Sequence, residues 1–193
     1  MVNALVQDEY LIRRKVLSLL GQKFHVYDSD HNLLLYTKQK AFKLKEDIRI
    51  YSDESMSEEL LSIQARQMID FSAAYDVIDV QEGKKVGALR RKGLRSILRD
   101  SWEFLDEHDN SIGKIEEDSM GMALLRRFLS NLIPQRFSAS NNGTDLASFR
   151  QDFNPFIFRL RVQMASGADE RIDPRLVLAG GILLAAIEGR QGD

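Results

Sequence analysis

Short runs of β-forming residues separated by turn residues make up most of the chain. Apolar and polar side chains alternate along 156–164, FIFRLRVQM, with the period of two that is typical of a half-buried strand. Comparable runs predict strands over 10–18, 22–27, 33–40, 48–51, 60–67, 75–80, 85–90, 102–105, 111–116, 134–139 and 146–151. Turn signals such as Glu82-Gly83 and Asn141-Asn142-Gly143 join neighbouring runs into hairpins. The pattern therefore predicts a mainly β protein.

Two segments depart from this pattern. Met120, Leu124 and Phe128 stand at helical spacing, so we expect a short helix over 120–129. The segment 173–190, DPRLVLAGGILLAAIEGR, has no charged side chain from Leu176 to Ile187. Asp173 suits a helix N-cap, Pro174 suits the first helical position, and Gly189 suits the position after the last turn. These signals predict a helix over 174–188.

The C-terminal helix has no polar face, so it must be surrounded on all sides. Its uncharged run is much shorter than the roughly 20 residues that a membrane span needs. We therefore predict a buried core helix, with membrane insertion and an oligomer contact as the alternatives. Gly180, Gly181 and Ala185 are small enough to let other parts of the chain approach closely.

A weak internal repeat suggests how the helix is enclosed. VYDSDHNLLLY (26–36) resembles FLDEHDNSIGK (104–114), and VIDVQEGKKVG (77–87) is a third hairpin of the same type. Repeated hairpins favour a meandering or closed sheet, and a closed barrel has no exposed edges. A barrel of about twelve strands leaves a lumen too wide for its own side chains to fill. We therefore predict a closed antiparallel barrel around the buried hydrophobic C-terminal helix.

Composition narrows the function classes. The 193 residues suffice for one domain, which we place over 1–193 with a core of about 10–190. The net charge is −2, so any site for a polyanion must be a local patch. The absence of cysteine excludes disulfides, thiolate metal sites, cysteine nucleophiles and S-acylation. The N-terminus lacks the basic and apolar regions of a signal peptide, so we expect a cytoplasmic protein.

Catalytic and metal-binding motifs are weak. The three histidines, at positions 25, 31 and 108, show no ligand spacing such as HExxH. Asp28, Asp30 and Asn32 resemble the start of a calcium loop, but Leu33 replaces the required glycine and Gln39 the final glutamate. We interpret this segment, and the related 106–110, as hairpin turns. We accordingly predict no catalytic residue, no metal site and no cofactor, although an enzyme with an unrecognised site stays an alternative.

Three segments together resemble a known family. They are YDSDHNLLLYTKQK (27–40), YDVIDVQEGKKVGALRRKGLRSILRDSWEFLDEHDNSIGKIEED (75–118) and IDPRLVLAGGILLAAIEGR (172–190). The chain, over about 10–190, is similar to the LURP-one-related proteins, within the superfamily of tubby C-terminal domains and phospholipid scramblases. The resemblance implies a barrel of roughly twelve strands around a hydrophobic C-terminal helix. It also implies binding rather than catalysis, since tubby domains bind phosphoinositides through basic surface residues. The cysteines and proline-rich N-terminal region of scramblases are missing, so we do not expect scramblase activity.

One basic segment is the candidate site. Residues 83–99, GKKVGALRRKGLRSILR, contain no acid and seven basic residues: Lys84, Lys85, Arg90, Arg91, Lys92, Arg95 and Arg99. Such a patch gains about 1 kcal/mol per basic residue near an anionic membrane, and it could instead contact nucleic-acid phosphates. The simplest alternative is a set of solvated strand and turn positions balanced by Asp100, Glu103 and Asp106. Arg126-Arg127 and Arg159/Arg161 are weaker basic positions, and we expect the last two to face water.

The leading hypothesis is a non-enzymatic module that binds anionic lipid headgroups, of the phosphoinositide kind, through residues 84–99. On this hypothesis the cytoplasmic protein associates peripherally with a membrane. The alternative is an intracellular adaptor or scaffold whose partner is another protein. Nucleic acid is the less favoured partner, and the sequence leaves the oligomeric state open.

Overall fold

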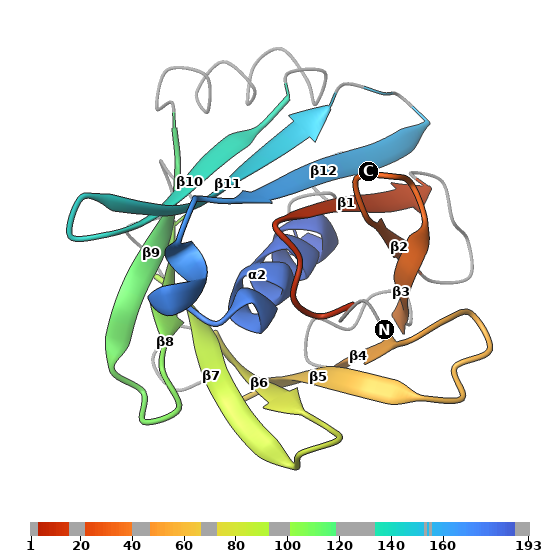
Figure 1. Cartoon of the computed structure of the whole chain (residues 1–193), viewed down its shortest axis with the longest axis horizontal. Helices are drawn as coiled ribbons and strands as arrows, with labels where there is room; N and C mark the ends of the chain where they lie inside the picture. Colours follow the sequence, from red (N-terminus) through yellow and green to blue (C-terminus); the bar gives the residue numbers. More distant parts are fainter. Residues whose placement is uncertain are drawn as a thin grey trace.

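The described residues form a closed antiparallel β-barrel with a helix in its lumen. The structure is a computed structural model, and it describes residues 4–15, 22–39, 47–66, 73–92, 101–118, 134–152, 154 and 156–187. Each strand pairs with its neighbours in chain order, and β12 pairs with β1 to close the barrel (Figure 1). The mainly β fold class predicted from the sequence is therefore confirmed.

The twelve strands lie close to the predicted segments. They are β1 (Glu9–Lys15), β2 (Gln22–Tyr27), β3 (Leu33–Gln39), β4 (Ile48–Tyr51), β5 (Glu59–Ala65), β6 (Ala74–Asp79), β7 (Lys84–Arg91), β8 (Ser101–Leu105), β9 (Ser111–Glu117), β10 (Arg136–Asn141), β11 (Thr144–Asp152) and β12 (Ile157–Met164). A short 3₁₀-helix, η2 (Ala168–Glu170), and the helix α2 (Pro174–Ile187) follow. Where predicted and observed boundaries can be compared, they agree within two residues. The helix predicted over 120–129 lies outside the described residues.

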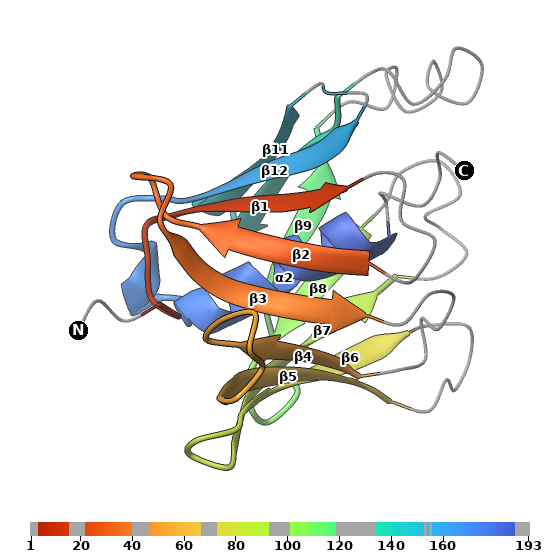
Figure 2. The same cartoon turned by 90° about the vertical axis from the view of Figure 1, so that its right-hand side faces the viewer.

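Helix α2 fills the lumen, as the apolar C-terminal segment predicted. Every residue from Leu176 to Ala186 is buried, and the strands surround the helix (Figures 1 and 2). A Cβ atom at Gly181 would lie 2.8 Å from Val162 Cγ2 and 2.9 Å from Ile12 Cδ1, so the barrel wall reaches the helix backbone there. No helix among the described residues is long and apolar enough to cross a membrane.

Polar contacts tie the start of α2 to the barrel. Asp173 is the N-cap: its Oδ1 accepts a hydrogen bond from the Arg175 backbone N–H at 2.9 Å. The Arg175 guanidinium in turn lies 2.6 Å from a carboxylate oxygen of Asp79, at the end of β6. The N-cap predicted at Asp173 is therefore confirmed, and the same residue orients an arginine toward the wall.

The two ends of the barrel differ in their connections. Because successive strands are antiparallel, all turns from an even-numbered to the next odd-numbered strand lie at one end, where α2 also begins (Figure 2). These turns are 28–32, 52–58, 80–83, 106–110 and 142–143. We call this the turn end. The far end is the opposite one, where β1, β3 and β11 finish and β2, β10 and β12 begin.

Candidate functional site

The residues of the predicted basic segment do not share one surface. Arg91 pairs with the core residue Trp102 and therefore faces the lumen, with its guanidinium carbon 5.9 Å from the indole ring centroid. Lys84 stands at the turn end and is largely exposed, with its nearest carboxylate, Glu82, 4.0 Å away. Arg95 and Arg99 lie outside the described residues. Outward-facing positions are left for Lys85, Arg90 and Lys92.

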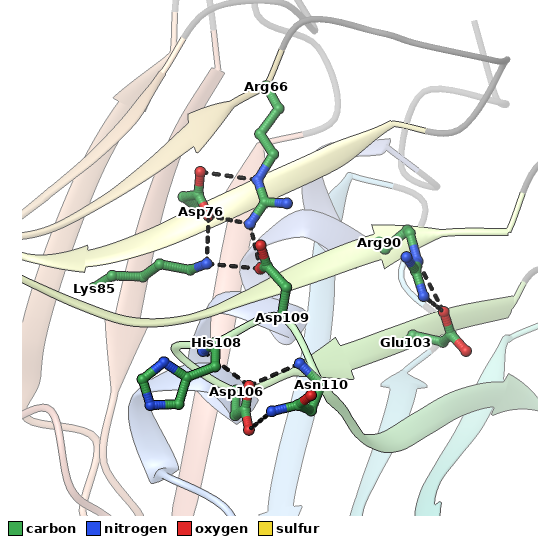
Figure 3. Close-up of polar contacts among 9 residues, drawn as sticks. All are labelled: Arg66, Asp76, Lys85, Arg90, Glu103, Asp106, His108, Asp109 and Asn110. Carbon is green, nitrogen blue, oxygen red and sulfur yellow. Dashed lines mark hydrogen bonds and ion pairs between the residues drawn. The ribbon is translucent and has the colours of Figure 1, made fainter.

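Arg90 and Lys92 share one carboxylate. Glu103 of β8 accepts hydrogen bonds from Arg90 at 2.9 and 2.6 Å (Figure 3). The same carboxylate lies 2.7 Å from Lys92 Nζ. Burial would raise the pKa of Glu103, but the bonds from Lys92 and Arg90 outweigh it and the pKa is lowered. Glu103 was expected to balance this segment, and it does so for two of the basic residues.

Lys85 belongs to a second, neutral network. Its Nζ lies 2.6 Å from Asp109 Oδ1 and 3.4 Å from Asp76 Oδ1. Arg66 contacts the same two carboxylates, at 2.5 Å from Asp76 and 2.6 Å from Asp109 (Figure 3). Hydrogen bonds from Arg66 and Lys85 lower the pKa of Asp109 to about 2. The network joins the end of β5 and strands β6 and β7 to the 106–110 turn.

The carboxylate of Asp106 bonds within its own turn and not to a described basic residue of the segment 83–99. Its oxygens accept bonds from the backbone N–H and the side-chain amide of Asn110, at 2.8 and 2.9 Å (Figure 3). The carboxylate of Asp28 accepts the corresponding two hydrogen bonds from Asn32, also at 2.8 and 2.9 Å. The third residue after each aspartate has φ 67° in both turns. The internal repeat noticed in the sequence is therefore a repeated turn geometry.

This geometry also accounts for the acidic residues that resemble a calcium loop. The side-chain bond from Asn32 lowers the pKa of Asp28, and the bond from Asn110 does the same for Asp106. Within the part of the chain that the structure describes, no three His, Cys, Asp or Glu residues gather in a way that could hold a metal ion. In both hairpins these carboxylates stabilise the turn.

A larger group of basic residues lies on the other side of the barrel. Where the structure describes the side chains, the outward positions of six adjacent strands, β10, β11, β12, β1, β2 and β3, carry seven cations that we call the basic face: Arg13, Lys23, Lys38, Arg136, Arg150, Arg159 and Arg161. Arg13 and Arg159 are half-buried, and the other five are exposed. As expected, Arg159 and Arg161 point away from the core. The surface is unusual because other cations surround these two arginines.

Many of these cations stand opposite one another. The strand registers place four like-charged pairs directly across from each other: Arg13–Arg159, Arg136–Arg150, Arg150–Arg161 and Lys23–Lys38. Like charges in directly opposed positions destabilise a sheet. Across the barrel from the basic face, on β7, β8 and β9, the charges in opposed positions are complementary, since Glu103 stands opposite both Arg90 and Lys114. Among the strand pairs that the structure describes, directly opposed like charges therefore occur only on the basic face.

Few carboxylates offset the basic face. Glu9 lies 2.9 Å and Asp152 3.5 Å from Arg161, and among the described residues these are its only ion pairs. The Arg13 guanidinium carbon lies 4.6 Å from the Tyr27 ring centroid, within the range of a cation–π interaction. A third acid on these strands, Asp145, lies beside the 142–143 turn at the turn end. Within the described ranges the other six cations of the basic face have no ion pair: Arg13, Lys23, Lys38, Arg136, Arg150 and Arg159.

The five turns at the turn end are acidic. They contain no lysine or arginine, and their acidic residues are Asp28, Asp30, Asp53, Glu54, Glu58, Glu82, Asp106, Glu107 and Asp109. The small net charge of −2 therefore conceals a separation of charge between these acidic turns and the basic face. This separation is not visible in the sequence, because the basic residues are scattered from position 13 to position 161.

Comparison with known proteins agrees with this architecture. A family model described as LURP-one-related matches residues 33–184, from the start of β3 to within α2. No curated protein and no solved structure matches the chain. The match covers most of the chain, and the closed barrel with its C-terminal helix is the fold that the resemblance implied. The chain belongs to the LURP-one-related family.

Proposed function

We propose that this protein is a non-enzymatic binding module that docks on anionic lipid headgroups through the basic face. The observation that carries the proposal is the set of four like-charged pairs in the sheet registers. Each pair lowers the stability of the barrel, and a local rule broken without an internal compensation is typical of a functional surface. An external layer of negative charge would supply that compensation.

The ion pairs of β7 favour the basic face over residues 84–99 as the main contact. Lys85 is neutralised by Asp76 and Asp109, and Arg90 and Lys92 share Glu103. A headgroup would have to compete with these carboxylates. Among the residues that the structure describes, Arg161 alone on the basic face has such competitors.

The shape of the basic face favours a membrane as the partner. The cations spread over six adjacent strands on the outside of a barrel, so an extended anionic surface can reach many of them together. Each basic residue near an anionic bilayer contributes about 1 kcal/mol, and salt weakens the attraction. A cytoplasmic protein would meet such lipids on the inner leaflet.

Co-sedimentation with vesicles tests the proposal. Purified protein is mixed with neutral phosphatidylcholine vesicles and with vesicles containing phosphatidylserine or a phosphoinositide, over a series of salt concentrations. We expect binding to the anionic vesicles only, with affinity falling as salt rises. The variant Arg13→Gln/Arg159→Gln should lose most of this binding, whereas Arg90→Gln, on the opposite side, should keep it.

Three results would overturn the proposal. The first is an absence of binding to anionic vesicles at low salt. The second is equal binding by wild type and Arg13→Gln/Arg159→Gln. The third is tighter binding to a duplex or single-stranded oligonucleotide than to vesicles at the same salt concentration. This result would indicate that the basic face binds nucleic acid.

A further inference from the structure

We infer that the far end of the barrel meets the membrane and that Phe156 inserts into the bilayer as an apolar anchor. This inference rests on the proposed function, and it adds an orientation and a residue that basic charge alone does not identify. It follows from three features of the far end: an exposed aromatic side chain, a turn that holds it, and the position of the cations.

Phe156 is unusually exposed for a large apolar side chain. Its relative exposure is 75%, whereas the other exposed large hydrophobic residues among those described have 39 to 44%. It immediately precedes β12, whose first residue lies at the far end of the barrel. Transfer of an exposed phenylalanine side chain from water into the apolar part of a membrane interface lowers the free energy.

A side-chain-capped turn holds Phe156 in this position. Asn154 Oδ1 accepts hydrogen bonds from the backbone N–H groups of Phe156 and Ile157, both at 2.9 Å. Asparagine commonly stabilises turns by bonding to the backbone two residues further on. The two bonds fix the backbone N–H groups of Phe156 and Ile157 relative to the Asn154 side chain, which reduces the entropy lost when the ring inserts.

Six of the seven cations of the basic face lie near the same end. Arg136 is the first residue of β10, Lys23 is the second of β2, Lys38 is the last but one of β3, and Arg13, Arg150 and Arg159 each lie two residues from the far-end limit of their strands. Arg159 follows Phe156 by three residues, or about 10 Å along an extended strand. The acidic turns occupy the opposite end, so a negatively charged membrane attracts the far end and repels the turn end.

Tryptophan fluorescence can locate the inserted residue. The chain has a single tryptophan, Trp102, which is 1% exposed in the core and gives a constant background. We compare Phe156→Trp with Val80→Trp, because Val80 is 39% exposed in a turn at the turn end. With phosphatidylserine vesicles that contain brominated lipid, Phe156→Trp should show a blue shift and quenching, and Val80→Trp should show neither.

A truncation separates the apolar and electrostatic contributions. We expect Phe156→Ala to weaken vesicle binding about tenfold or more while leaving its salt dependence unchanged. Arg159→Gln should instead reduce the steepness of the salt dependence. Phe156→Ala leaves the turn bonds from Asn154 in place, since they involve only the backbone of residue 156.

The outcomes distinguish the inference from the proposed function. If the protein sediments with anionic vesicles but Phe156→Trp is not quenched, the inference fails and the proposed function stands. If Val80→Trp is quenched instead, the orientation is wrong. If neither variant nor wild type binds vesicles, the proposed function itself fails.

Discussion

Arg13 of β1 and Arg159 of β12 lie directly opposite each other on the outside of the barrel, in the strand pair that closes it. The Nε atoms of both are buried without a hydrogen-bond partner. Since like charges in this position repel, we expect Arg159→Gln to raise the free energy of unfolding by about 0.2–1 kcal/mol. Urea unfolding at low salt measures the gain, which should shrink as salt screens the repulsion.

Arg90→Gln is the matched control for that substitution. Arg90 also stands opposite a charged residue, but its partner is Glu103, whose side chain is only 12% exposed. Removing Arg90 leaves this carboxylate with Lys92 alone, so the free energy of unfolding should fall. If both variants lose stability alike, repulsion across β1 and β12 is not significant and the argument for the basic face weakens.

The network around Asp109 predicts a loss of stability in acid. Hydrogen bonds from Arg66 and Lys85 hold the pKa of Asp109 at about 2, below its ordinary value of 3.8. A lowered pKa stabilises the folded state above the unfolded pKa, and this contribution disappears as pH falls through the folded one. The unfolding free energy of wild type should therefore fall between about pH 4 and 2.

Asp109→Asn isolates this contribution. The variant should be less stable than wild type at pH 6, and the difference should narrow as pH approaches 2. We expect a modest effect, because the Asp109 side chain is 46% exposed and solvent screens the interaction. A difference between the two proteins that stays constant from pH 6 to 2 would show that the ionised form of Asp109 is not what stabilises the network.

Local signals explain why the fold could be predicted. The cap at Asp173, the helical position of Pro174 and the apolar run after them are contiguous, and they define α2 without any knowledge of the barrel. The paired turns at Asp28 and Asp106 likewise depend on a few adjacent residues. Local signals are insufficient in strand β8. All four residues from Trp102 to Leu105 are buried, so the alternation of apolar and polar residues does not identify the outer face of this strand.

The basic face could not be derived in the same way. It depends on the register between β1 and β12, which brings Arg13 beside Arg159 although they are distant in sequence. A run of basic letters such as 83–99 is visible in the sequence, but the carboxylates that neutralise it come from other strands and turns. Asp109 contacts Lys85. Asp106, which the sequence suggested as a balancing acid, instead accepts a hydrogen bond from Asn110.

A buried tyrosine predicts sensitivity to alkali. Tyr10 is 0% exposed, and its hydroxyl oxygen accepts a hydrogen bond from the Gln7 backbone N–H at 3.0 Å. Burial raises the pKa of Tyr10 above its ordinary value of 10.0. A raised pKa stabilises the folded state fully below the unfolded value, and this contribution is lost as pH rises beyond it. The free energy of unfolding should therefore fall above about pH 10.

Tyr10→Phe tests the origin of this effect. The variant should lose about 1 kcal/mol at pH 7, because the Gln7 N–H loses an acceptor. Above pH 10 it should lose stability less steeply than wild type. Equal slopes in urea unfolding from pH 8 to 11 would mean that other groups cause the alkaline transition.

A substitution at Leu183 tests directly whether helix α2 lies in the lumen of the barrel. Leu183 lies within α2 and is 1% exposed inside the barrel. In Leu183→Asp an unpaired carboxylate would replace an apolar side chain in the core, at a cost of several kcal/mol against a typical total stability of about 5–15 kcal/mol. We expect this variant to be unfolded by circular dichroism, while Leu183→Met, which roughly conserves volume, should lose less than about 1.5 kcal/mol. A folded, soluble Leu183→Asp protein would contradict the placement of α2 in the lumen, because only an exposed position tolerates that charge.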